Sequence, residues 1–188
     1  PGPVSKAGVV NKCVNLGWGV FDIETQLSQL TGLPVKAGND ANVAALGEYW
    51  RGGGQGYSSM VMVTLGTGVG GGTLLGLSKK MLGMDNIEHI ENLAKDGNLS
   101  HIDLKINDLT KADIVPGFSD TMTASNFGNV SDIATKADIA LGVINLVFET
   151  IGMVSVFAAR NHGLRDVVLT GNLTTVERAP EVFGTLNK

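Results

Sequence analysis

The chain has 188 residues, with 14 basic against 18 acidic side chains, a net charge of −4 and a mean hydropathy of +0.17. This apolar and weakly charged composition is typical of a folded globular protein and excludes intrinsic disorder. The acidic balance argues against nucleic acid or an anionic membrane surface as the main partner.

The single cysteine, Cys13, excludes a disulfide framework and every multi-cysteine zinc site. No apolar run approaches the ~20 residues that cross a bilayer. The start at Pro1 carries neither Met nor a basic segment, so we expect no signal peptide and a cytoplasmic, soluble protein. Glycine is the unusual residue, with 26 copies, about twice its usual ~7% share.

Apolar spacing and capping residues predict the elements of the N-terminal third. In chain order they are short strands at 9–10 and 13–14, a helix from Asp22 or Thr25 to Gly32, a short buried strand at 34–37, and a helix at 41–50 capped by Asn39 or Asp40.

In the remaining chain, a β-rich run at 59–65 enters a glycine cluster, and residues 73–77 are expected to return as the second strand of a hairpin. A helix is predicted at 85–95, a polar loop at 99–120, a buried strand at 166–170, and a final helix at 175–186 interrupted by Pro180.

A long helix starting at Asp132 is the strongest signal. Its stripe alternates spacings of four and three residues through Ile133, Ala137, Ala140, Ile144, Val147, Ile151, Val154 and Ala158. The stripe fits a dimer seam as well as core packing within one chain. Strands alternating with helices predict an α/β fold, with a mostly parallel sheet, one β-hairpin and one long helix.

The glycine cluster Leu65-Gly66-Thr67-Gly68-Val69-Gly70-Gly71-Gly72-Thr73 is the first candidate site. Glycine permits backbone conformations in which several N–H groups converge on an anion, and two threonines add hydroxyl donors. The expected second strand distinguishes the turn from a dinucleotide-binding fingerprint, and a Walker lysine is missing. The spacing alone fits a phosphate-binding turn and a tight hairpin without ligand equally well.

Asp40 lies at a strand-to-helix junction, where a carboxylate could act as general base toward a substrate hydroxyl. The residues alone favour an ordinary helix cap. Gly171-Asn172 ends a strand where a flat ring could approach the backbone, although a plain turn is the simpler interpretation. The three histidines lie in no metal-ligand spacing, and we expect no metal site.

The first part of the chain resembles bacterial glucokinases of the repressor/sugar-kinase (ROK) family over residues 1–72. The matching stretches include Gly38-Asn39-Asp40-Ala41-Asn42 and Val63-Thr64-Leu65-Gly66-Thr67-Gly68. Residues 70–188 instead resemble the type II pantothenate kinases, through Ala124-Ser125-Asn126-Phe127-Gly128-Asn129 and Val168-Leu169-Thr170-Gly171-Asn172. Both resemblances imply part of the actin-like/hexokinase (ribonuclease H-like) ATPase fold.

Two resemblances that meet inside one hairpin suggest a fusion of two fragments, 1–72 and 73–188, joined near Gly70 to Thr73 and packed as one compact unit. We expect such a chimera to be engineered, to test recombination of fold fragments. The abrupt start at Pro1 and the end at Lys188 agree with a cut piece.

The resemblance assigns roles residue by residue. Asp40 matches the catalytic base of the sugar kinases, with Asn39, Asn15 and Trp18 on the substrate side. The resemblance further implies phosphate and nucleotide contacts, with Mg-ATP as ligand, at Gly66, Thr67, Gly68, Gly70, Gly171 and Asn172.

The N-terminal Asp-x-Gly-Gly-Thr-type phosphate turn of this fold has no match here, nor do the sugar-binding His/Glu segment and the zinc-binding cysteines of the ROK family. Phosphoryl transfer depends on positioning and charge stabilisation. We therefore expect a fusion without efficient catalysis. A residual nucleotide-binding module and a working ATP-dependent sugar or pantothenate kinase are the alternatives.

Overall fold

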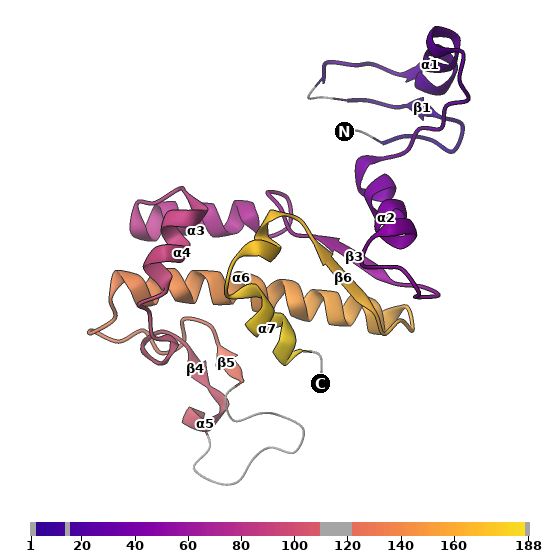
Figure 1. The fold of residues 1–188 in the computed structure, drawn as a ribbon. Coiled ribbons are helices and arrows are strands. Elements are labelled where there is room, and N and C mark those ends of the chain that lie inside the picture. Colours follow the sequence, from indigo (N-terminus) through magenta and orange to yellow (C-terminus); the bar gives the residue numbers. More distant parts are fainter. Residues whose placement is uncertain (1–2, 14–15, 110–121, 187–188) are drawn as a thin grey trace. The chain divides into compact units, whose positions relative to one another are not determined.

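A computed structural model describes residues 3–13, 16–109 and 122–186. The chain divides into two compact units, an N-terminal unit (1–60) and a C-terminal unit (61–188), and each is described by itself. Figure 1 shows the order of the elements along the chain. The division into fragments 1–72 and 73–188, and their packing as one unit, stay predictions.

The N-terminal unit contains an antiparallel pair of β1 (Val9–Val10) and β2 (Phe21–Asp22), followed by α1 (Ile23–Thr31) and α2 (Asp40–Arg51). Both predicted helices are confirmed. The carboxylate of Asp22 caps α1 by accepting a hydrogen bond from the Thr25 amide at 3.0 Å. Gly32 ends the helix in the left-handed conformation that glycine adopts freely.

The predicted buried strand at 34–37 is wrong, because these residues form no strand and none of them is buried. An extended segment forms the backbone hydrogen bonds of a sheet only when another strand lies beside it. Cys13 makes an isolated bridge with Trp18, and Val14 of the predicted second strand lies outside the described residues. Neither α1 nor α2 contains a buried residue.

The C-terminal unit is built around a parallel pair, β3 (Val61–Thr64) and β6 (Val167–Thr170). Both strands fall within their predicted runs. The core of the unit lies where α3 (Gly71–Leu82), α4 (Ile87–Ala94) and α7 (Ala179–Thr185) pack against one long helix, α6 (Lys136–Asn161). Phe148, in the middle of α6, is completely buried.

The expected return strand at 73–77 is wrong, because these residues belong to α3. Leu74, Ser78 and Leu82 recur every four residues and form the buried face of that helix. The glycine turn therefore connects a strand to a helix. The mostly parallel sheet is also wrong for the described residues, which form three two-stranded sheets, of which only β3–β6 is parallel.

The long helix begins at Lys136, four residues later than predicted. A capping box sets this start, since the Thr135 side chain accepts from the Asp138 amide while the Asp138 carboxylate accepts from the Thr135 amide. Ile133 lies before the helix and is exposed. By length and composition α6 could cross a membrane, contrary to expectation, but 56% of its most apolar window is buried within the unit.

The remaining elements are short. They are a 3₁₀ turn at Leu99–His101, β4 (Leu104–Lys105), α5 (Ile106–Leu109), β5 (Thr123–Ser125), which is antiparallel to β4, and a 3₁₀ turn at Asn172–Thr175. The predicted loop at 99–120 therefore carries structure up to 109, and 110–120 lie outside the described residues. Pro180 occupies the first turn of α7, where it needs no backbone donor, and interrupts nothing.

Candidate functional site

The carboxyl ends of β3 and β6 lie side by side, because the strands are parallel and in register from Val61↔Val167 to Thr64↔Thr170. Each strand leads into a glycine turn, at 66–70 after β3 and at Gly171 after β6. The structure thus brings together the two groups of residues predicted to contact a nucleotide. Ligands of open α/β sheets bind outside this edge of the strands.

Leu65 links the two turns. Its amide donates to the carbonyl of Thr170 at 2.7 Å, and its carbonyl accepts from the amide of Leu173 at 3.3 Å. The Leu65 side chain is completely buried in the core. The turn after β3 is therefore held against the turn after β6 by backbone contacts.

The turn after β3 uses part of its own hydrogen-bonding capacity. The Gly71 amide donates to the Gly66 carbonyl at 2.8 Å, and the Gly72 amide donates to the Thr67 carbonyl at 2.9 Å. The amides of the exposed residues Thr67, Gly68 and Val69 have no partner within the described part of the chain. The first two amides of α3 are therefore taken, while the three amides at the tip of the turn remain as donors for a ligand.

The glycines of this turn serve different purposes. Gly70 has φ +90°, and a Cβ there would lie 2.5 Å from Cδ1 of Ile151, so this position needs glycine for the close approach to α6. At Gly66 and Gly68 a Cβ would meet no atom within 4 Å. Those two positions border open space, where a ligand could approach the backbone.

The site is electrically neutral in its own residues. No Lys or Arg occurs between Arg51 and Lys79, and no Asp or Glu between Glu48 and Asp85. An anion at the turn would be held by neutral amides and by the positive end of α3. Within the described residues, no group of three or more His, Cys, Asp and Glu could hold a metal ion.

The predicted sugar-side residues lie in the N-terminal unit. Asn39, and not Asp40, is the cap of α2, since its side chain accepts from the Ala41 amide at 3.1 Å. Asp40 is the first residue of the helix and is exposed. Trp18 is 41% exposed and meets Phe21 edge to face. Asn15 lies outside the described residues.

A network of buried polar side chains in the C-terminal unit was not predicted from the sequence. The Asp103 carboxylate is completely buried, and it accepts from the Phe127 amide at 2.9 Å and from the Asn145 side chain at 3.0 Å. Burial raises the pKa of this carboxyl, with the Glu149 charge adding to the effect. Arg178 in turn donates to the side-chain oxygen Oδ1 of Asn145 at 3.4 Å.

Beside this network, the Glu149 carboxylate accepts from Thr123 at 2.8 Å and from Asn126 at 2.7 Å. Phe127, in the same turn as Asn126, has φ +57°, which is uncommon for a residue with a side chain. The available signal was the presence of Asn145 and Glu149 on a mostly apolar helix, because buried polar groups require partners. These contacts fix the turn after β5 against α6.

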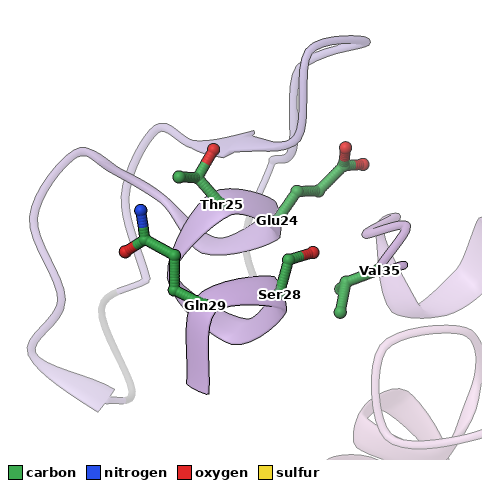
Figure 2. Close-up of a pocket in the computed structure, with 5 residues that line it drawn as sticks. All are labelled: Glu24, Thr25, Ser28, Gln29 and Val35. Carbon is green, nitrogen blue, oxygen red and sulfur yellow. The ribbon is translucent and has the colours of Figure 1, made fainter. Parts of the chain in front are cut away.

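An open pocket of about 410 Å³ in the N-terminal unit is lined by Glu24, Thr25, Ser28, Gln29 and Val35 (Figure 2). Its most polar groups already have partners. The Glu24 carboxylate accepts from Lys36 and from the Ala37 amide, both at 2.9 Å, and Thr25 donates to Asp22 at 2.6 Å. The carboxylate of Glu24 and the hydroxyl of Thr25 are thus already engaged within the unit.

Comparison with known proteins confirms both resemblances. The sequence model of the ROK family matches residues 1–86. A glucokinase of Halalkalibacterium halodurans is 52% identical over 65 residues, which are 35% of this chain and 20% of that protein. A Streptomyces coelicolor glucokinase is 40% identical over 80 residues, covering 39% of this chain and 25% of its own length.

The rest of the chain matches a second group. A type II pantothenate kinase of Staphylococcus saprophyticus is 37% identical over 111 residues, 57% of this chain and 42% of that protein. The chain thus spans less than half the length of each of these relatives. The model of the Fumble family matches residues 57–186, well over half of the chain, and overlaps the ROK match across the glycine turn and α3. The chain belongs to the Fumble family and carries a ROK-like kinase segment at its N-terminal end.

Proposed function

We propose that this chain binds the phosphates of a nucleotide, with Mg-ATP as the ligand, at the turn after β3. The observation that carries the proposal is the set of three free amides at Thr67, Gly68 and Val69 on the carboxyl edge of a parallel strand pair. Gly171 and Asn172 follow β6 and lie beside this turn, and they would contact the nucleoside part of the ligand. The match to the Fumble family covers residues 57–186, which include both turns.

The charge of the site supports a ligand that brings its own cation. Since the turn has no basic residue of its own, the repulsion between phosphates would be screened by the bound Mg²⁺. The amides would then fix the oxygens in place, and α3 would add the favourable field of its N-terminus. We expect the affinity for free anions to be weaker than that for the magnesium complex.

We further propose that the 188 residues are a fusion of two kinase segments that transfers phosphate inefficiently. The ROK and Fumble matches overlap at 57–86, which includes the proposed joint near Gly70 to Thr73. No Asp-x-Gly-Gly-Thr-type turn occurs in the sequence, and transfer depends on clamping the phosphates from several directions. Asp40 would be the base if transfer occurs.

An isothermal titration of the full chain with Mg²⁺ and a non-hydrolysable ATP analogue tests the binding proposal. A methyl group at Gly68 meets no protein atom within 4 Å, so Gly68→Ala should weaken binding without harming the fold. Gly76→Ala, at an exposed position of α3 that is equally open, is the matched control and should bind like the parent. Absence of saturable binding by the parent at millimolar nucleotide would refute the proposal.

Kinase assays with glucose and with pantothenate separate the remaining alternatives. We expect transfer below detection with both acceptors. Product formation that Asp40→Ala abolishes would instead establish a working kinase with the base proposed here. We also propose a cytoplasmic protein without nucleic-acid or membrane partners. A sedimentation measurement of the molecular mass in solution tests whether the chain forms a homodimer through α6.

A further inference from the structure

Two threonine hydroxyls lie on the last register pair of the parallel strands. Thr64 and Thr170 face each other across β3 and β6, with their Oγ1 atoms 3.3 Å apart. The preceding residues, Val63 and Leu169, pack against the core. Because side chains alternate between the two faces of a strand, the threonines lie on the opposite face, and Thr64 is exposed.

The hydrogen bond between the hydroxyls leaves one donor free. A threonine hydroxyl has one proton and two lone pairs. Thr170 donates its proton to Thr64, and the proton of Thr64 has no acceptor among the described residues. A hydroxyl that accepts one hydrogen bond becomes a better donor of another. Thr64 is therefore a polarised, exposed donor one residue before the linking residue Leu65.

Resting on the phosphate-binding function proposed above, we infer that the Thr64 hydroxyl donates to a phosphate oxygen of the bound nucleotide and that Thr170 positions it. The free amides of residues 67–69 and this hydroxyl would then contact the phosphates from one edge of the strand pair. The hydroxyl extends the donor set from the turn onto β3. Because Thr170 on β6 donates to this hydroxyl, the strength of the Thr64 donor depends on the pairing of β3 with β6.

Titration of three variants with the magnesium complex of the ATP analogue tests this inference. Thr64→Val removes the donor while keeping the β-branched shape, and we expect affinity to fall roughly 10- to 150-fold, the range for one lost hydrogen bond to a charged oxygen. Thr64→Ser keeps a hydroxyl and should stay within about 2-fold of the parent. Thr170→Val removes only the polarising partner and should weaken binding roughly 2- to 3-fold.

A purely structural role predicts a different pattern. If the pair only holds the strand ends in register, Thr64→Val and Thr170→Val will lower the melting temperature and weaken binding equally, and adenosine will be affected as much as the ATP analogue. We expect the penalty of Thr64→Val with the analogue only. If the parent binds the analogue and Thr64→Val binds it as tightly, the inference about Thr64 fails while the proposed function stands. No binding by the parent would refute the proposed function itself.

Discussion

Gly171 lies so close to Leu65 that a Cβ at position 171 would stand 2.4 Å from the Leu65 carbonyl oxygen. Gly171 also has φ +97°, a conformation that residues with side chains rarely adopt. The same carbonyl accepts the Leu173 amide, and the Leu65 amide is bonded to Thr170. The two turns of the candidate site are therefore held together by backbone atoms, and the geometry of the site depends on the pairing of β3 with β6.

Replacing Gly171 by alanine should destabilise the C-terminal unit. The methyl group would collide with backbone that cannot rotate away, and the left-handed conformation adds strain, so we expect a loss of about 3 kcal/mol in the free energy of unfolding. Urea unfolding followed by circular dichroism at 222 nm measures it. Gly76→Ala, in the open interior of α3, should instead stabilise by roughly 0.5–1 kcal/mol. Equal effects of the two substitutions would contradict this account of Gly171.

A second prediction concerns the approach of Gly70 to α6. A Cβ at position 70 would lie 2.5 Å from Cδ1 of Ile151, the methyl group that valine lacks. Gly70→Ala should therefore be less damaging when Ile151→Val is present, with a coupling of about 1 kcal/mol in a double-mutant cycle. Full rescue is not expected, since Cγ1 of Val147 would still be 3.0 Å away and φ is +90°. Strict additivity of the two free-energy changes would show that the contact is not the reason for glycine.

The long helix offers a direct test of which apolar positions matter. The sequence stripe places Ile144 and Val154 on one face, yet Ile144 is 2% exposed and Val154 is 62% exposed. Ile144→Ala should cost about 2–5 kcal/mol in the free energy of unfolding, while Val154→Ala should change it by at most about 0.5 kcal/mol. Comparable losses at both positions in urea unfolding would mean that Val154 is covered in solution.

Local signals explain which elements were predictable. The stripe of α6, the Asp22 and Asn39 caps and the β-rich run before the glycines each act within a few residues, and the structure confirms the elements they predict. The return strand at 73–77 failed because a glycine-rich start looked like a hairpin. The buried spacing of Leu74, Ser78 and Leu82 was the better guide to that segment.

Long-range contacts explain most of what the sequence could not provide. The turns after β3 and β6 were recognised separately, and only the parallel register brings them to one edge. The partners of Asp103 and Glu149 come from segments more than twenty residues away, so no local pattern announces them. Likewise, the free amides at 67–69 depend on where Gly71 and Gly72 donate, which the glycine spacing does not specify.

The last prediction concerns acid stability through Asp138. Its carboxylate accepts from the amides of Thr135 at 2.8 Å and Asn98 at 2.6 Å and lies 3.2 Å from Nδ1 of His101. Led by the Thr135 amide, these contacts lower the pKa of Asp138 from 3.8 to about 2. A carboxyl whose pKa is lower in the folded state stabilises above its unfolded pKa, and that stability is lost as pH falls through the folded value.

We therefore expect Asp138 to contribute about 2 kcal/mol above pH ~4, with the contribution vanishing near pH ~2. Urea unfolding of the parent and of Asp138→Asn at several pH values should show a gap in unfolding free energy that closes over this interval. Asp132→Asn, at an exposed position before the helix, is the charge-matched control. Asp103 has a raised pKa and acts in the opposite direction, but it is present in both proteins and cancels in the difference. A gap that stays constant from neutral pH to pH ~2 would mean that Asp138 stabilises α6 only through interactions its protonated form retains.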